Sequence, residues 1–343
     1  MPWSKIPLHD EELGASPPGA HVATYAEALL EAQTQLLEAC PEVFLIGQGL
    51  DDPGGVFGST LGLAARFPGR VLDSPISENA VTGACAGAAM SGLRPILIHM
   101  RGDFLFMSMD QLVNHVAKWR YMGNGQTSVP LVVRSVIGRG WGSGAQHSQA
   151  PHGLFMHVPG LKIAVPATPY DAKGLLLRAS ADGNPVLFFE HRWLYAAKGH
   201  VPDAPYALPF GSGVVRREGT DATVIAVLQM VKEACLAAES LSREGLEIEV
   251  IDPRTLCPLD MELIWRSVKK TGRLLVADNA HGVCGLGAEI IARVAEHGVG
   301  LKAPPARVNF PFVPAPASPV LEDAYYPSAR HIEQVVRNMV RPR

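Results

Sequence analysis

The fold class of this chain is decided by residues 70–100, RVLDSPISENAVTGACAGAAMSGLRPILIHM. Residues 70–76 and 94–100 are short apolar runs typical of buried strands, and the small residues 79–93 between them predict a helix. Two such strands joined by a helical crossover pair in parallel. Because the same alternation continues along the chain, we expect an α/β fold, with a doubly wound parallel sheet covered by helices on both faces.

The alternation is interrupted between residues 200 and 213, HVPDAPYALPFGSG, which hold three prolines and show no apolar period. This stretch is predicted to be a linker, in keeping with a chain length of about two domains. It separates a larger domain over residues 22–199 from a smaller one over residues 214–343, and residues 1–21 form a polar leader. Near the end, the proline-dense residues 314–328 predict an extended, irregular segment.

Composition narrows the classes of function. The 343 residues include 30 basic and 33 acidic side chains, for a formal net charge of −3, which leaves no large positive field for a phosphate backbone. Nucleic-acid binding is therefore not expected. Charged residues make up 18% of the chain, below the roughly 25% of ordinary soluble domains. Less of the surface is suited to water, so we expect part of it to be covered by another subunit.

Membrane segments and targeting signals are not expected either. Apolar stretches are interrupted by a charge, glycine or proline well before the roughly 18 residues that a membrane helix needs. The N-terminal leader lacks both an apolar signal core and the arginine-rich bias of a transit peptide, so a cytoplasmic location is predicted. The five cysteines are scattered and never spaced C-x-x-C, which predicts reduced, buried thiols.

Common catalytic motifs are absent from the sequence. It contains no G-x-x-x-x-G-K-[ST], no G-x-G-x-x-G between a strand and a helix, and no H-E-x-x-H. Ser143 lacks the glycine two residues before it that a hydrolase nucleophile elbow requires. These absences argue against an NTPase, a dinucleotide dehydrogenase of the usual type, a zinc protease and a serine hydrolase.

The first candidate site residue is Glu78, in SPISENAVTG. It lies where a predicted strand gives way to a predicted helix, at the sheet edge where doubly wound folds bind ligands. Beside alanine, glycine and cysteine its charge would be poorly solvated, so the carboxyl group could hold or donate a proton near neutral pH. The alternative is that Glu78 only interacts with the dipole at the helix N-terminus. Its surroundings in the sequence leave both possibilities open.

The second candidate is His147, which follows four glycines in a short loop, Gly138, Gly140, Gly142 and Gly144. So much backbone freedom beside an imidazole suits a loop that faces a substrate. With twelve histidines in the chain, an ordinary surface or capping histidine is the alternative. The loop context is what favours a functional role.

At these residues the sequence resembles the β subunits of the thiamine-diphosphate-dependent first component of 2-oxoacid dehydrogenase complexes, which include pyruvate, branched-chain and acetoin enzymes. The resemblance runs from about residue 22 to the C-terminus. Its most specific stretches are SPISENAVTGACAGAAMSGLRPI, DQLVNHVAKWRYMGNGQ, GAQHSQAPH, PGLKIAVPATPYDAKGLL and VIDPRTLCPLD. It implies that residues 22–199 form a pyrimidine-binding domain and that residues 214–343 form a smaller transketolase C-terminal-type α/β domain.

The resemblance also implies roles for single residues. The family acid that hydrogen-bonds N1′ of the thiamine pyrimidine corresponds to Glu78, and there it favours the imino tautomer that removes the thiazolium C2 proton. Phe104 is implied to pack on the pyrimidine ring and Met100 to make an apolar contact, although both residue types are also common in cores. His147 matches a histidine that lines the active-site channel and is associated with acyl transfer to lipoamide.

Two further positions follow from the resemblance. Asp182 and Asn184 in ADGNPV are similar to a loop that binds a monovalent cation in some relatives, which implies a potassium site. Gln48 stands where the family commonly has an acid that joins paired active sites, and glutamine cannot ionise. Two reactions therefore stay open: decarboxylation of a 2-oxoacid with acyl transfer to lipoamide, or acyl joining by a two-subunit transketolase-like carboligase. A degenerate scaffold subunit is disfavoured, because Glu78 and Phe104 are both present.

An absent motif bears on the partners. Thiamine enzymes mark the domain that holds the diphosphate through Mg²⁺ with G-D-G, and this chain has no G-D-G. The resemblance thus implies that an α subunit holds the diphosphate and the Mg²⁺ and that this chain is catalytically incomplete alone. The expected assembly is an α₂β₂ heterotetramer with a second β copy, which serves a lipoyl acyltransferase.

Overall fold

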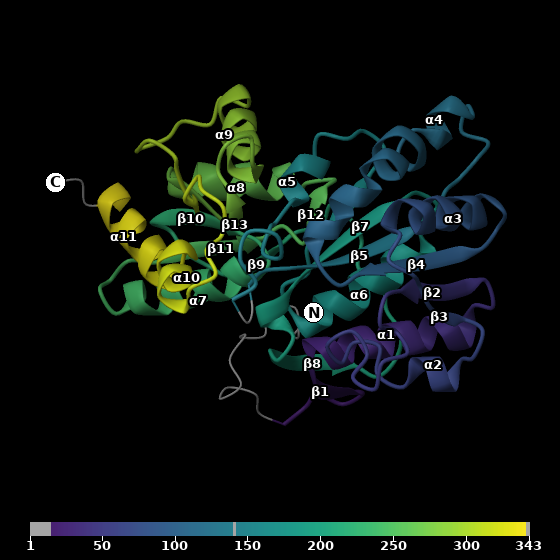
Figure 1. Cartoon of the computed structure of the whole chain (residues 1–343). Coiled ribbons are helices and arrows are strands. Elements are labelled where there is room, and N and C mark those ends of the chain that lie inside the picture. Colours follow the sequence, from purple (N-terminus) through teal and green to yellow (C-terminus); the bar gives the residue numbers. More distant parts are fainter. Residues whose placement is uncertain (1–14, 140–141, 341–343) are drawn as a thin grey trace.

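The computed structural model describes residues 15–139 and 142–340, and these residues form two α/β units side by side (Figure 1). In the described residues the larger sheet has seven strands in the order β12-β6-β7-β5-β4-β2-β3, parallel except for β12. Six of them are β2 (Val43–Gly47), β3 (Val71–Asp73), β4 (Arg94–His99), β5 (Val132–Ile137), β6 (Lys162–Ala164) and β7 (Val186–His191). The predicted parallel α/β sheet is confirmed.

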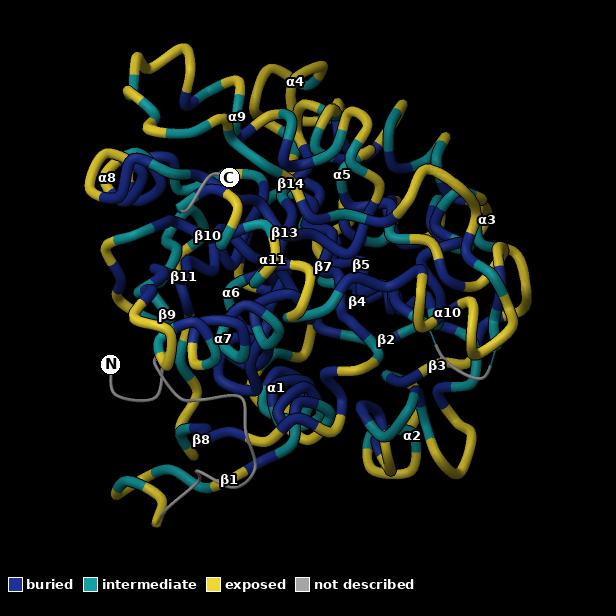
Figure 2. Tube along the Cα trace, turned by 90° about the vertical axis from the view of Figure 1, so that its left-hand side faces the viewer, coloured by how far each residue is buried: buried dark blue, intermediate teal, exposed yellow. Residues whose placement is uncertain are grey.

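Helices cover both faces of this sheet, because successive strand residues point to opposite sides. Ile96 and Ile98 of β4 join the core under α1 and α6, and Leu97 between them joins the core under α3. The buried strands stand out in the tube of Figure 2. The helical elements of this unit are α1 (Tyr25–Ala39), α2 (Leu63–Arg66), α3 (Glu78–Met90), a 3-10 segment (Gly102–Ser108), a π-helix (Asp110–Val116), α4 (Trp119–Met122), α5 (His152–Phe155), α6 (Pro169–Ala181) and a 3-10 turn (Arg192–Leu194).

The smaller unit is built on a sheet with the order β14-β13-β10-β11-β9, parallel except for β9. Helices α7 and α11 share a core on one face of this sheet. The strands are β9 (Val214–Arg217), β10 (Ala222–Ala226), β11 (Ile248–Asp252), β13 (Leu274–His281) and β14 (Ala306–Phe310). The helices are α7 (Gln229–Ser242), α8 (Met261–Thr271), α9 (Leu286–Glu296), α10 (Pro319–Tyr325) and α11 (Ala329–Val340).

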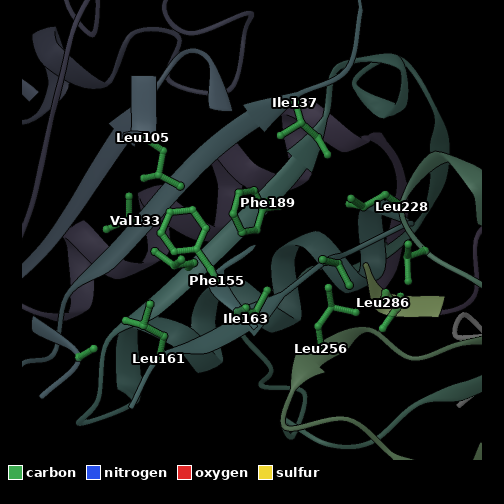
Figure 3. Close-up of a cluster of buried hydrophobic side chains, with 14 of the residues drawn as sticks. Leu105, Val133, Ile137, Phe155, Leu161, Ile163, Phe189, Leu228, Leu256 and Leu286 are labelled. Carbon is green, nitrogen blue, oxygen red and sulfur yellow. The ribbon is translucent and has the colours of Figure 1, made fainter. Parts of the chain in front are cut away.

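The two units share one hydrophobic core. Val133 and Phe189 of the larger sheet belong to the same cluster as Leu256 and Leu286 of the smaller unit (Figure 3). In addition, β12 (Thr255–Cys257) leaves the smaller unit and pairs antiparallel with β6 at the edge of the larger sheet. The two units therefore pack tightly against each other and are not independent domains joined by a flexible linker.

A buried ion cluster joins the same two units. Asp171, in the first turn of α6, accepts a hydrogen bond from Arg254 Nε at 2.8 Å and is paired with Arg216. Arg216 also donates to Asp252 Oδ2 at 2.6 Å. The two guanidinium groups hold the pKa of Asp171 below its usual range although its burial acts in the opposite direction.

Several segments differ from the sequence expectation. Residues 20–21 of the predicted leader and 200–202 of the predicted linker pair as strands β1 (Ala20–Thr24) and β8 (Lys198–Pro202). The segment 314–328 was expected to be irregular but contains α10. Pro319 is compatible with this helix because it lies in the first turn, where the backbone N–H that proline lacks would have no partner within the helix. Residues 1–14 of the leader and Gly140 of the glycine loop lie outside the described residues.

Two expectations about the chain as a whole can be compared with the fold. Within the described ranges, none of the helices is both long and apolar enough to cross a membrane. All five cysteines are free within this same part of the chain, as expected, but only Cys85 is fully buried. Cys40, Cys235 and Cys257 are half-buried and Cys284 is exposed, so the expectation that the thiols are buried is wrong for Cys284 and holds only in part for these three.

Candidate active site

The candidate site lies where three neighbouring parallel strands end. β2 sits between β3 and β4, and the chain visits β3 on one side before it returns to β4 on the other, so ligands are expected in the crevice at their carboxyl ends. Gln48 directly follows β2, Glu78 follows β3 and begins α3, and His99 ends β4. These three side chains line one small pocket together with Met100 and Phe104.

Glu78 is held firmly by its backbone. Its carbonyl oxygen accepts hydrogen bonds from Thr82 Oγ1 at 2.7 Å and from Ser108 Oγ at 3.2 Å, and both hydroxyl side chains are fully buried. Its carboxylate is half-buried and accepts a hydrogen bond from Gln48 Nε2 at 3.2 Å. Glu78 therefore occupies both positions that the sequence left open, the first turn of a helix and the wall of a pocket.

Close packing of β2 against β4 helps to position Gln48 and therefore the Glu78 carboxylate. Gly47 precedes Gln48, and a Cβ atom at this position would lie 2.5 Å from the carbonyl oxygen of Ile98. Only glycine lets β2 and β4 approach so closely at the pocket floor.

His99 was not singled out from the sequence. Its side chain is 6% exposed, and its Nε2 atom is buried without a hydrogen-bond partner among the residues that the structure describes. Burial lowers the pKa of His99 to about 4, although the nearby Glu78 charge acts in the opposite direction, so the imidazole is neutral at neutral pH. A polar residue that ends the apolar strand RPILIH at the ligand edge was the signal that could have identified it.

The structure brings His147 to the same region. Met100 and Phe104 are half-buried in the pocket wall, and the ring of Phe104 meets the His147 ring edge-on at a centroid distance of 5.3 Å. His147 itself is exposed. Four of the residues selected from the sequence, Glu78, Met100, Phe104 and His147, thus lie together around one pocket and its rim.

The 3-10 segment and the arginine before it anchor the His147 loop at both ends. Arg101 Nη1 donates to the carbonyl oxygen of Gly138 at 3.0 Å. Asp103 Oδ1 accepts hydrogen bonds from Gln149, from the backbone nitrogen at 3.2 Å and from Nε2 at 2.9 Å. Burial raises the pKa of Asp103, while the hydrogen bonds from Gln149 and the charge of His147 oppose this rise. In the sequence, the one sign of these anchors is a pair of charged residues, Arg101 and Asp103, in the apolar run MRGDFLF, and this was too little to identify them.

Asp182 and Asn184 lie elsewhere, before the amino-terminal end of β7 and thus at the opposite edge of the sheet. Asp182 Oδ2 pairs with Lys162 Nζ at 2.6 Å and with Arg178 at 3.1 Å, and its Oδ1 accepts from Asn184 Nδ2 at 2.8 Å. Burial acts to raise the pKa of Asp182, but the hydrogen bonds from Lys162 and Asn184 outweigh it and hold this pKa below its usual range. A cation at this place would have to bind mainly backbone carbonyl oxygens.

A divalent-metal centre is not formed by the acids, histidines and cysteines that the structure describes. In the described ranges, no group of three or more such side chains is arranged to hold a metal ion. The potassium site at Asp182 and Asn184 stays a prediction.

Comparisons with known proteins agree with this arrangement. The chain matches the transketolase pyrimidine binding domain over residues 21–198 and the transketolase C-terminal domain over residues 211–332. It is 43% identical over 325 residues to the acetoin:2,6-dichlorophenolindophenol oxidoreductase subunit beta of Cupriavidus necator, an alignment that covers 92% of this chain and 96% of that protein.

Two other relatives carry different substrate names. The chain is 39% identical to the 2-oxoisovalerate dehydrogenase subunit beta of Bacillus subtilis, with 93% of this chain and 98% of that protein covered. It is 40% identical to the mitochondrial pyruvate dehydrogenase E1 component subunit beta-2 of Oryza sativa subsp. japonica, with 92% and 84% covered. A solved split-gene transketolase, an inactive beta4 tetramer, has the same fold, with a TM-score of 0.76 at 23% identity over 92% of this chain and 98% of that chain.

Proposed function

Because the chain belongs to the family of the β subunits of thiamine-diphosphate-dependent 2-oxoacid dehydrogenases, we propose that it provides the pyrimidine side of a thiamine-diphosphate site. The observation that carries the proposal is the pocket that Glu78 lines together with the aromatic Phe104 and the apolar Met100. One carboxylate among apolar and aromatic neighbours fits a flat, weakly polar ring that carries a basic nitrogen.

Each residue has a task in this proposal. Glu78 holds and exchanges a proton at the ring nitrogen N1′, and Gln48 orients the Glu78 carboxylate by donating to Oε1. Met100 and Phe104 pack against the ring and exclude water. When bound, thiamine diphosphate supplies the nucleophilic carbon that decarboxylates a 2-oxoacid. His147, exposed at the rim, donates a proton or a hydrogen bond during acyl transfer to lipoamide.

The proposal includes partners. The curated relatives are named as β subunits, and this sequence lacks the G-D-G motif, which supports an α subunit that holds Mg²⁺ and the diphosphate. The assembly would be an α₂β₂ heterotetramer with two β copies. A lipoyl acyltransferase would carry the lipoamide that accepts the acyl group, and potassium would bind at Asp182 and Asn184.

The direct test is a turnover assay on this chain co-purified with its α subunit. Pyruvate and branched-chain 2-oxoacids are assayed for release of CO₂, and acetoin, which has no carboxyl group, is assayed for carbon–carbon cleavage that releases acetaldehyde. Each substrate is supplied with and without lipoamide. We expect turnover that depends on thiamine diphosphate and is abolished in Glu78→Ala with the fold intact. Glu262→Ala is the matched control, because Glu262 is an exposed acid in the first turn of α8. If Glu78→Ala keeps turnover within a few-fold of the wild type, as the control should, the acid serves only the helix dipole and the proposal fails.

A second candidate function rests on Gln48. Because Gln48 contributes an amide rather than a carboxyl group beside Glu78, the acid chain that connects paired active sites in the family is interrupted here. This favours a two-subunit carboligase that passes the acyl unit to an aldehyde. A coupled product formed with an aldehyde acceptor, at a rate that lipoamide does not increase, would identify the carboligase. Turnover that depends on lipoamide would identify the 2-oxoacid dehydrogenase.

A further inference from the structure

His99 is a polar residue of the pocket that the proposed function leaves without a task. It ends β4, lines the same pocket as Glu78 and Phe104, and is 6% exposed. Its Nε2 atom finds no hydrogen-bond partner in residues 15–139 and 142–340. A buried ring nitrogen without a partner costs folding free energy, so nearly all such atoms in proteins are paired with protein, water or ligand.

The surroundings keep this imidazole uncharged. The residues that line the pocket with it include the apolar Leu97, Ile98 and Met100, and Glu78, whose carboxylate Gln48 already engages, is the acid among these lining residues. Desolvation outweighs the attraction to Glu78 and lowers the pKa of His99 to about 4. A neutral imidazole presents one N–H donor and one lone pair, so it can match a ligand that offers either group.

We propose that His99 is a second binding residue for the aminopyrimidine ring, and that its buried Nε2 gains its hydrogen-bond partner from that ring. This inference rests on the proposed function. An aminopyrimidine carries an exocyclic amine and two ring nitrogens, so it offers more hydrogen-bonding groups than Glu78 alone can engage. His99 meets one of them from the floor of the pocket, while Glu78 meets the ring from the start of α3.

The neutral state of the His99 imidazole affects how Glu78 can exchange its proton. A cation at position 99 would pair with the Glu78 carboxylate and hold it ionised, whereas a neutral ring leaves the Glu78 proton free to move to and from the ligand. His99 thereby adds recognition without fixing the charge of the acid.

The test measures cofactor binding rather than turnover. The chain in complex with its α subunit is titrated with thiamine diphosphate and Mg²⁺ by calorimetry. We expect His99→Phe to weaken binding about tenfold, which is the effect of losing one buried hydrogen bond to a ligand. His99→Asn keeps a donor and an acceptor and should recover most of the affinity. His115→Phe is the control, since that histidine is exposed on the π-helix.

Inorganic pyrophosphate with Mg²⁺ serves as a second probe, because it lacks the pyrimidine. His99→Phe should bind it as the wild type does. Equal loss of affinity for both probes, or unchanged affinity for thiamine diphosphate, would overturn the assignment. His99→Leu is a second apolar variant in case the phenylalanine prevents assembly. If the wild-type complex binds pyrophosphate but not thiamine diphosphate, the proposed function itself fails, and this inference fails with it.

Discussion

Acid should destabilise this protein partly through His99, and the size of the effect follows from its burial. The folded-state pKa of His99 is about 4, against an ordinary value of 6.5. As the pH falls from 6.5 towards 4, His99 takes up a proton in the unfolded chain but stays neutral in the folded chain. The free energy of unfolding, which is at its full value above about pH 6.5, therefore decreases over this range. Between about pH 7 and pH 5, the linkage relation gives a loss of about 2 kcal/mol from this residue.

The measurement compares two pH values and two proteins. Urea unfolding of the wild type and of His99→Phe at about pH 7 and pH 5 gives four free energies of unfolding. The wild type should lose about 2 kcal/mol more than the variant between the two conditions, because phenylalanine does not titrate. His115→Phe should follow the wild type, since its ring is exposed in the folded chain. Identical pH dependence in the wild type and His99→Phe would refute the claim that the buried imidazole stays neutral.

Three further perturbations probe the site and its support. Asp103→Ala removes the acceptor of both Gln149 hydrogen bonds. It should lower kcat at least about tenfold and make residues 142–150 accessible to proteolysis. Asp103→Asn keeps a side-chain acceptor and should keep most of the activity. Asp171→Asn takes the paired carboxylate away from the buried Arg254 guanidinium, while Arg216 keeps its pair with Asp252. It should lower the free energy of unfolding by about 3 kcal/mol in urea titrations, and an unchanged free energy would show that the cluster does not stabilise the fold. Gly47→Ala should impair thiamine-diphosphate binding, measured by calorimetry, because its Cβ would press on the Ile98 carbonyl; wild-type affinity would contradict this.

The sequence predicted those parts of the fold that depend on local periodicity. The strand and helix around Glu78 were predictable, because apolar runs and small residues alternate there at the spacing of a parallel sheet. β12 was not, because a three-residue strand has too few positions to show a period and its partner β6 lies about ninety residues away in the chain. α10 was hidden by prolines, which are as compatible with a first helical turn as with a loop.

The site divides in the same way. Glu78, Phe104 and His147 could be selected because each stands in a recognisable segment. His99 and Asp103 could not, since their importance depends on burial and on which loop folds back onto them. A hydrogen bond between residues 46 positions apart, as between Asp103 and Gln149, leaves little trace in a single sequence.

The pairing of β12 with β6 has a consequence for how the chain can be divided. A fragment that stops near residue 213 would contain every residue of the pocket, yet it would lack β12 and so leave the backbone of β6 open along the edge of the sheet. Open edges recruit other strands, so such a fragment should aggregate. Recombination or laboratory truncation at the apparent linker therefore separates segments that are adjacent in the folded sheet.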